Sequence, residues 1–162
     1  MPYLLDTNLF IQAKNEYYGF DICPGFWTWL EQMNRKKQIF SIKQVYEELV
    51  GYGDDLSLWT KKQGAKFFLD QNSQILEQHR VVAETVQSGR YPEPAMRIFM
   101  SGADPMLIAH ALANSKSNII VTHESRKKGN IRIPRLCDEL NIKCISTFQM
   151  LRQEGVQFVV AS

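Results

Sequence analysis

The sequence predicts an α/β protein with a parallel sheet that is covered by helices on both faces. Short apolar runs typical of buried strands occur at residues 3–5 and 119–121, and residues 143–145 are predicted to form a third strand. Segments with helical spacing of apolar residues lie between and after them. Because strands that alternate with helices form crossover units, the strands are expected to run parallel. No fixed repeat, low-complexity tract or composition shift marks a linker, so residues 1–162 are expected to form one domain.

Local signals set the elements of the first third of the chain. The apolar residues after Asp6 recur at helical spacing, which predicts a strand that turns directly into a helix. A second helix is expected after the break at residues 23–25. It runs to the basic residues 35–37, and its aromatic side chains are expected in the core. After a brief apolar run at residues 39–40, Ser41 is predicted to cap a third helix.

A helix-rich segment is expected next, followed by helices that alternate with the later strands. Residues 54–101 are predicted to be rich in helix, and no chemistry is assigned to them. A strong helix follows within residues 101–114. Shorter helices are expected from residue 134 to 140 and from residue 147 onwards.

The composition is that of a soluble globular protein. The 44% hydrophobic share is enough for a core without disulfides or structural metal, and 19 basic against 17 acidic residues give a net charge of only +2. Three cysteines without a close pair are typical of reduced thiols in a cytosolic protein. The first residues do not indicate a secretory signal, and no apolar stretch is long enough to span a membrane, so the cytoplasm is the expected compartment.

Two acidic residues follow predicted strands. In an open parallel sheet, ligands bind outside the carboxyl ends of the strands. Asp6 closes the first strand, and Glu124 lies three residues after Val121. Taken alone, Asp6 could be a helix N-cap and Glu124 an ordinary loop acid.

Two further acids lie on predicted helices. Asp104 heads the apolar stripe of its helix, although an Asp before Pro105 is also typical of an N-cap. In the pair Glu47 and Glu48, an exposed ion pair with Lys43 would account for Glu47. Glu48 is nearer the buried flank of the helix and is the better candidate, although the pair leaves an uncertainty of one residue.

Four carboxylates gathered at one sheet edge predict a cation site. They would repel one another and have raised pKa values unless cations neutralised them. Oxygen ligands suit Mg²⁺ or Mn²⁺, whereas the three histidines show no zinc-site spacing. Such ions can activate water and offset the charge of a phosphodiester during hydrolysis.

Four motifs in this order resemble those of PIN-domain nucleases. They are LLDTNLFI at residues 4–11, SIKQVYEEL at 41–49, ADPMLIAHAL at 103–112 and IIVTHE at 119–124. The chain is similar to VapC-like toxins and to a less-characterised prokaryotic branch of the PIN-like superfamily. The resemblance implies a Rossmann-like three-layer α/β/α domain with a mostly parallel sheet. It also implies a divalent-metal-dependent endoribonuclease that acts on RNA, in many prokaryotic members as the toxin of a toxin–antitoxin pair.

The resemblance also implies roles for particular residues. It assigns four acids to catalysis and to the metal: Asp6, Glu48, Asp104 and Glu124. Asn8 and Thr122 become candidates for orienting those acids or the attacking water. A homodimer and a small antitoxin that blocks the acidic pocket are expected from the family. In this chain the last motif ends in Glu124 without a following Asp, and this departure bears on whether a second ion binds.

A basic segment follows the last acid. Residues 126–135 hold five basic residues and no acid. Arg126, Lys127 and Lys128 are expected to contact the phosphate backbone, with a solvated basic loop as the ordinary alternative. The tryptophans are expected in the core, so no aromatic platform for stacking on bases is identified from the sequence.

Two other functions remain open at this point. The first is a structure-specific DNA nuclease, because related folds serve flap endonucleases, although the chain has no room for the arch and clamp segments of those enzymes. The second is a non-catalytic nucleic-acid-binding module, which the unusual Glu124 motivates.

Overall fold

The strands form one parallel sheet whose order is β3-β2-β1-β4-β5. The computed structural model describes residues 2–114, 118–123 and 131–161. The strand bounds are β1 Tyr3–Leu5, β2 Ile39–Ile42, β3 Phe68–Leu69, β4 Ile119–Val121 and β5 Cys144–Ile145. Each neighbouring pair runs parallel, so the predicted parallel α/β sheet is confirmed.

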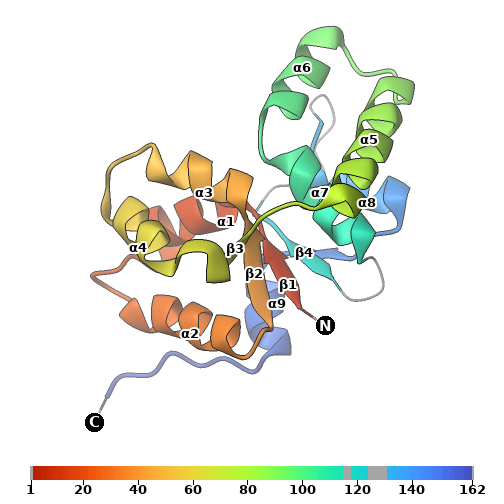
Figure 1. The fold of residues 1–162 in the computed structure, drawn as a ribbon. Helices are drawn as coiled ribbons and strands as arrows, with labels where there is room; N and C mark the ends of the chain where they lie inside the picture. The colour runs from red at the N-terminus through yellow and green to blue at the C-terminus, as the bar shows by residue number, and fades with distance from the viewer. Residues whose placement is uncertain (1, 115–117, 124–130, 162) are drawn as a thin grey trace.

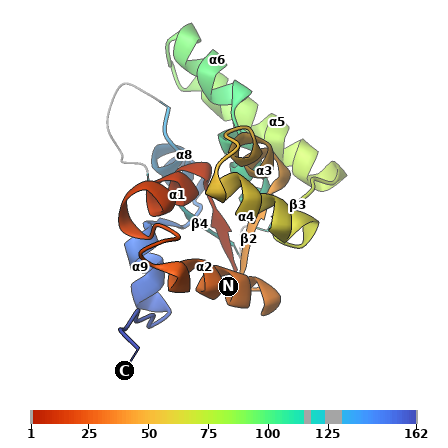
Figure 2. The ribbon, with the colours of Figure 1, turned by 90° about the vertical axis from the view of Figure 1, so that its left-hand side faces the viewer.

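Helices cover both faces of this sheet. Their bounds are α1 Thr7–Gln12, the π-helical turn η1 Ala13–Tyr17, α2 Pro24–Arg35, α3 Lys43–Val50, α4 Asp55–Gln63, the 3-10 turn η2 Gly64–Lys66, α5 Ser73–Ser88, α6 Glu93–Ser101, α7 Asp104–Ala113, α8 Ile133–Leu140 and α9 Thr147–Gln153. Figure 1 shows α5, α7 and α8 on one side of the strands, and α2, α4 and α9 face the viewer on the other side in Figure 2. In the part of the chain that the structure describes, no helix is long and apolar enough to cross a membrane.

Strand order places a crevice beside β1. The chain leaves β1 for β2 and β3 on one flank and then returns to β4 on the other flank. The order therefore reverses between β1 and β4, and ligands of open α/β sheets bind at the carboxyl ends of the strands at such a point. The register pairs Leu5 with Val121, so the residues that follow these two lie level with each other.

One local prediction, the helix cap at Ser41, was wrong. Ser41 does not cap a helix: it is a buried residue inside β2, its hydroxyl donates to Leu5 O at 2.6 Å, and the helix cap is Ile42. A contact with a distant strand thus overrides the local capping signal of Ser41. The segment 54–101 is rich in helix, as expected, and also contains the short strand β3. Ser41 N donates to Phe67 O, just before this strand, at 2.8 Å.

An aromatic cluster fixes α1 against the helices on one face. The Phe10 ring lies 6.5 Å from Trp27 and 5.9 Å from Trp59, measured between ring centroids, and Phe67 packs on the same ring at 6.1 Å. Trp27 and Trp59 are buried as expected, whereas Trp29 is only partly buried. Because Phe10 lies one turn after Asp6, this packing also fixes the start of α1.

The central helix α7 contains a buried histidine. His110 is 4% exposed, and its Nε2 atom has no hydrogen-bond partner among the described residues. Burial lowers the pKa of His110 from 6.5 to about 4, because the charged imidazolium would lose its hydration. The folded protein therefore holds this side chain in its neutral form.

We predict that His110 makes the fold sensitive to acid. Its pKa is lower in the folded than in the unfolded chain, so its contribution to stability is complete above pH 6.5 and is lost as the pH falls toward 4. Between about pH 8 and pH 5, the free energy of unfolding of the wild type should fall by about 2 kcal/mol more than that of His110→Gln.

Urea unfolding at each pH measures this difference. The same substitution at His79, which is only partly buried on α5, is the matched control and should keep the wild-type pH profile. Parallel profiles for the wild type and His110→Gln would contradict the prediction.

Candidate active site

A pocket of about 400 Å³ opens at the carboxyl edge of the sheet, beside the reversal of strand order. The polar residues of its lining are Asp6, Thr7, Asn8, Glu48, Tyr52, Asp104 and Arg132. Three of the four acids predicted from the sequence thus share one pocket. Glu124 and the predicted substrate contacts Arg126, Lys127 and Lys128 lie outside the described residues.

Asp6 is held between the two strands that flank the reversal. Its backbone N–H donates to Val121 O at 3.0 Å, and Thr122 Oγ1 donates to Asp6 Oδ2 at 2.7 Å. The residue is only 1% exposed. A carboxylate so deeply buried needs hydrogen-bond donors to remain charged, and Thr122 supplies one of them.

Glu48 joins three separate elements. Its Oε2 accepts from Thr7 Oγ1 at 2.6 Å, and its Oε1 accepts from the backbone N–H of Ala103 at 2.9 Å. Ala103 is the N-cap of α7, so the carboxylate lies at the positive end of that helix.

The packing of α3 decides which glutamate of the pair faces the pocket. Val45 and Leu49 are fully buried, and they fix the rotation of the helix about its axis. In this orientation Glu48 lines the pocket. Glu47 is exposed and lies beside Lys43 at a different cavity.

Asp104 reaches the pocket from the first turn of α7. The alternative role of Asp104 as an N-cap is wrong, because Ala103 caps the helix and Asp104 is the first helical residue. A carboxylate in the first turn is favoured by the helix dipole. The position therefore suits a negative side chain that is also accessible from the pocket.

The donor set of the pocket is made of oxygen atoms. Asp6, Glu48 and Asp104 supply carboxylates, and no histidine or cysteine of the described chain lines the pocket. An ionised carboxylate has about four lone-pair positions, so one that accepts two hydrogen bonds keeps acceptor capacity for a hard cation. Within the described ranges, however, no three His, Cys, Asp or Glu side chains are grouped closely enough to hold a metal ion as they stand.

Thr7 and Arg132 are polar residues of the pocket that the sequence did not single out individually. Thr7 directly follows Asp6, but nothing local indicates that its hydroxyl bonds to Glu48 on another helix. Arg132 belongs to the basic segment, and its position before α8 places it in the pocket lining. Of the two predicted supporting residues, Asn8 lines the pocket and Thr122 contacts Asp6.

We predict that the Thr122 hydroxyl stabilises the folded protein through Asp6. Thr122→Val should lower the free energy of unfolding at neutral pH by about 1.5–3 kcal/mol, because the variant leaves a buried carboxylate without this donor. The control is Thr147→Val, the same change at a buried threonine whose hydroxyl has no hydrogen-bond partner among the described residues. Urea unfolding should show a loss of at most about 0.5 kcal/mol for the control. Equal losses in the two variants would show that the Thr122 contact contributes nothing.

The fold is similar to those of two solved VapBC structures. A chain of the crystal structure of VapBC2 from Rickettsia felis bound to a DNA fragment from their promoter has 15% identity and a TM-score of 0.55, over 90% of this chain and 98% of that chain. A chain of the 2.2 Å structure of VapBC-1 from nontypeable Haemophilus influenzae has 18% identity and a TM-score of 0.51, over 89% and 96%. The expected PIN-like fold is thus confirmed.

Comparisons of sequence give the family. No curated protein matches the chain. A family model matches residues 3–158, which include every acid of the pocket. The chain therefore belongs to the family described as Domain of unknown function (DUF4411).

Proposed function

We propose that this chain is a divalent-metal-dependent endoribonuclease that hydrolyses phosphodiester bonds in RNA. The main support is that Asp6, Glu48 and Asp104 line one pocket at the strand-order reversal of a PIN-like fold. Glu124 is proposed as a fourth acid of the site.

The oxygen donors of the pocket suit Mg²⁺ or Mn²⁺. Asp6, Glu48 and Asp104 would hold the ion, which when bound activates water and offsets the charge of the phosphodiester. Hydrogen bonds within the protein already orient two of these acids. Thr122 fixes Asp6, and Thr7 together with the Ala103 N–H fixes Glu48.

Two other lining residues are assigned to the substrate. Arg132 provides a guanidinium group at the pocket, which can form charge-assisted hydrogen bonds with a phosphate. Asn8 is proposed to orient the attacking water through its side-chain amide. Positive charge next to the acids would oppose the repulsion between the pocket and the RNA backbone.

We predict that cleavage depends on the acids of the pocket. Purified protein should cleave single-stranded RNA with Mg²⁺ or Mn²⁺ and not with EDTA. Asp6→Asn, Asp104→Asn and Glu48→Gln should each lower the rate by at least about a hundredfold, because changes in residues that only support a metal ligand already cost about 10- to 100-fold. Glu47→Gln is the matched control and should cleave like the wild type, since Glu47 is exposed outside the pocket.

The outcome also separates the alternatives. Equal cleavage by the wild type and the three pocket variants would overturn the proposal, and preferential cleavage of branched DNA would indicate a DNA nuclease instead. A non-catalytic binding module has one structural argument in its favour, because both Glu48 oxygens already accept hydrogen bonds from the protein. RNA binding without any binding of Mg²⁺ or Mn²⁺ in calorimetry would support that second candidate.

We further propose that the chain is the toxin of a toxin–antitoxin pair in the cytoplasm. The similarity to chains of two VapBC structures supports this. Expression of the wild type alone should arrest growth, and Asp6→Asn should not. Co-expression with the product of the adjoining gene should restore growth and yield a stable complex in size-exclusion chromatography. If cells tolerate the wild type and Asp6→Asn equally well, the toxin role is wrong.

A further inference from the structure

Three ring side chains from distant parts of the sequence meet beside the candidate active site. Tyr17 ends the π-helical turn η1, His123 follows β4, and Phe148 lies in the first turn of α9. The Tyr17 centroid is 5.1 Å from Phe148 at an interplanar angle of 88° and 5.5 Å from His123. His123 and Phe148 are 5.9 Å apart. We call these three residues the ring cluster.

The ring cluster lies along the same sheet edge as the acids. His123 directly follows Thr122, whose hydroxyl bonds to Asp6, and Phe148 comes shortly after β5, the next strand along the sheet. Glu48 lies on α3, which follows β2 on the opposite flank of β1. Neighbouring strands are about 4.8 Å apart. An extended polymeric ligand bound along this edge would therefore contact the acids and the rings one after the other.

Tyr17 is both held in place and accessible. It is 46% exposed although its ring packs on two others. The next residue is anchored, because the Tyr18 ring stacks on Phe26 at 4.6 Å and Trp27 Nε1 donates to Tyr18 O at 2.7 Å. An aromatic ring that is already fixed loses little conformational entropy when it binds.

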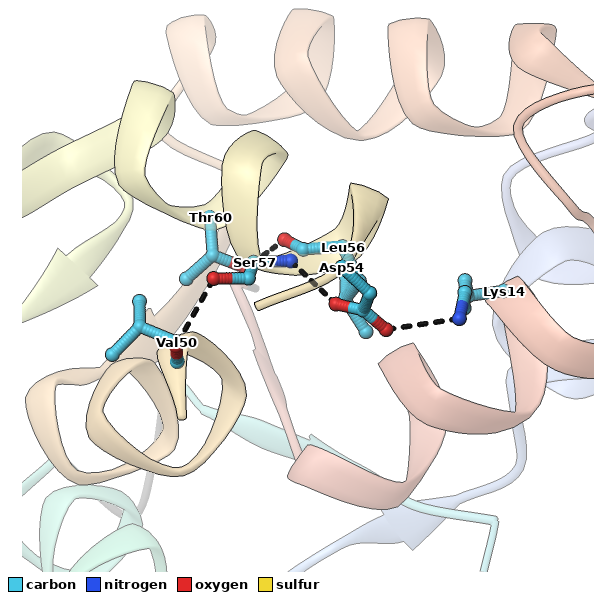
Figure 3. Close-up of polar contacts among 6 residues, drawn as sticks. All are labelled: Lys14, Val50, Asp54, Leu56, Ser57 and Thr60. Carbon is cyan, nitrogen blue, oxygen red and sulfur yellow. Dashed lines mark hydrogen bonds and ion pairs between the residues drawn. The ribbon is translucent and has the colours of Figure 1, made fainter. Parts of the chain in front are cut away.

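A salt bridge anchors the other end of the π-helical turn. Lys14 Nζ lies 2.9 Å from Asp54 Oδ2, and Asp54 Oδ1 also accepts from Ser57 N at 2.9 Å (Figure 3). The hydrogen bond from Lys14 and the one from Ser57 lower the pKa of Asp54, so the carboxylate stays charged. The turn is thus tied to α4 on one side and to α2 on the other, with Tyr17 left at the surface.

We propose that Tyr17, supported by His123 and Phe148, stacks on an unpaired base of the nucleic-acid strand whose backbone lies at the acidic pocket. This inference rests on the proposed function and adds a base-binding subsite to it. A nucleobase fits because rings recognise it by its flat face, whereas the carboxylates next to them repel phosphate. The subsite requires a single strand, since a paired base within a duplex does not offer its face.

Fluorescence of a substituted base tests the subsite without any need for cleavage. A short single-stranded RNA with one 2-aminopurine, whose fluorescence falls on stacking, is titrated with the full chain in Ca²⁺ and in EDTA. Tyr17→Leu should raise the Kd by about tenfold and abolish the quenching, because one base–aromatic stack is lost. Tyr17→Phe should keep both. Tyr91→Leu is the matched control and should bind like the wild type, because Tyr91 packs on Arg135 and is not part of the ring cluster.

Each result has a distinct meaning. Wild-type affinity and quenching in Tyr17→Leu would overturn the ring subsite, even if the protein cleaves RNA. Equal binding of the single strand and its duplex, or no binding by the wild type in either buffer, would also overturn it. Binding and quenching that depend on Tyr17, without cleavage in Mg²⁺ or Mn²⁺, would support the subsite and contradict the proposed nuclease. A DNA strand of the same sequence shows whether the subsite distinguishes the sugar, and circular dichroism checks that each variant folds.

Discussion

The hydrogen bond from Thr122 to Asp6 is the contact on which the candidate site depends. It joins the ends of β1 and β4, the two strands between which the sheet order reverses. The register that pairs Leu5 with Val121 brings the next residues, Asp6 and Thr122, level with each other. A slip of one residue would turn the side chains to the opposite face of the sheet. A carboxylate that is 1% exposed would be costly to bury without such donors. The position of Asp6 therefore depends both on the strand register and on the hydrogen-bond donors that accompany its burial.

Glu48 extends this constraint to the helices around the pocket. One carboxylate oxygen bonds to Thr7 at the start of α1, and the other bonds to the N–H of Ala103 before α7. Three elements that are far apart in sequence thus meet at a single side chain. The acids of the pocket have a structural role as well as a proposed chemical one, because the same hydrogen bonds that hold the carboxylates in place also hold the helix starts together.

Most of the fold could be predicted from the sequence because its signals are local. Short strand-like runs indicated β1, β4 and β5, and the rule for parallel sheets indicated that Asp6, which follows β1, would lie at the ligand-binding edge, where it lines the pocket. The features that could not be predicted have a common cause in distant contacts. Ser41 has the chemistry of a helix cap, yet its hydroxyl bonds to β1, and the two residues of β3 are too few to form a pattern. Thr7 and Arg132 likewise acquire their place in the pocket only through the packing of α1 and α8.

The ring cluster shows why an aromatic surface was not recognised in the sequence. Trp27 and Trp59 pack in the core, whereas Tyr17, the last residue of the π-helical turn, is exposed. In the proposed arrangement, contacts with phosphate and stacking on bases occur at different places along one sheet edge. Contacts with phosphate weaken as salt rises, because they release counterions, whereas stacking on an uncharged ring does not involve counterions. Acids that repel phosphate can therefore lie beside a subsite that retains the strand through its bases, so that binding and cleavage depend on different residues.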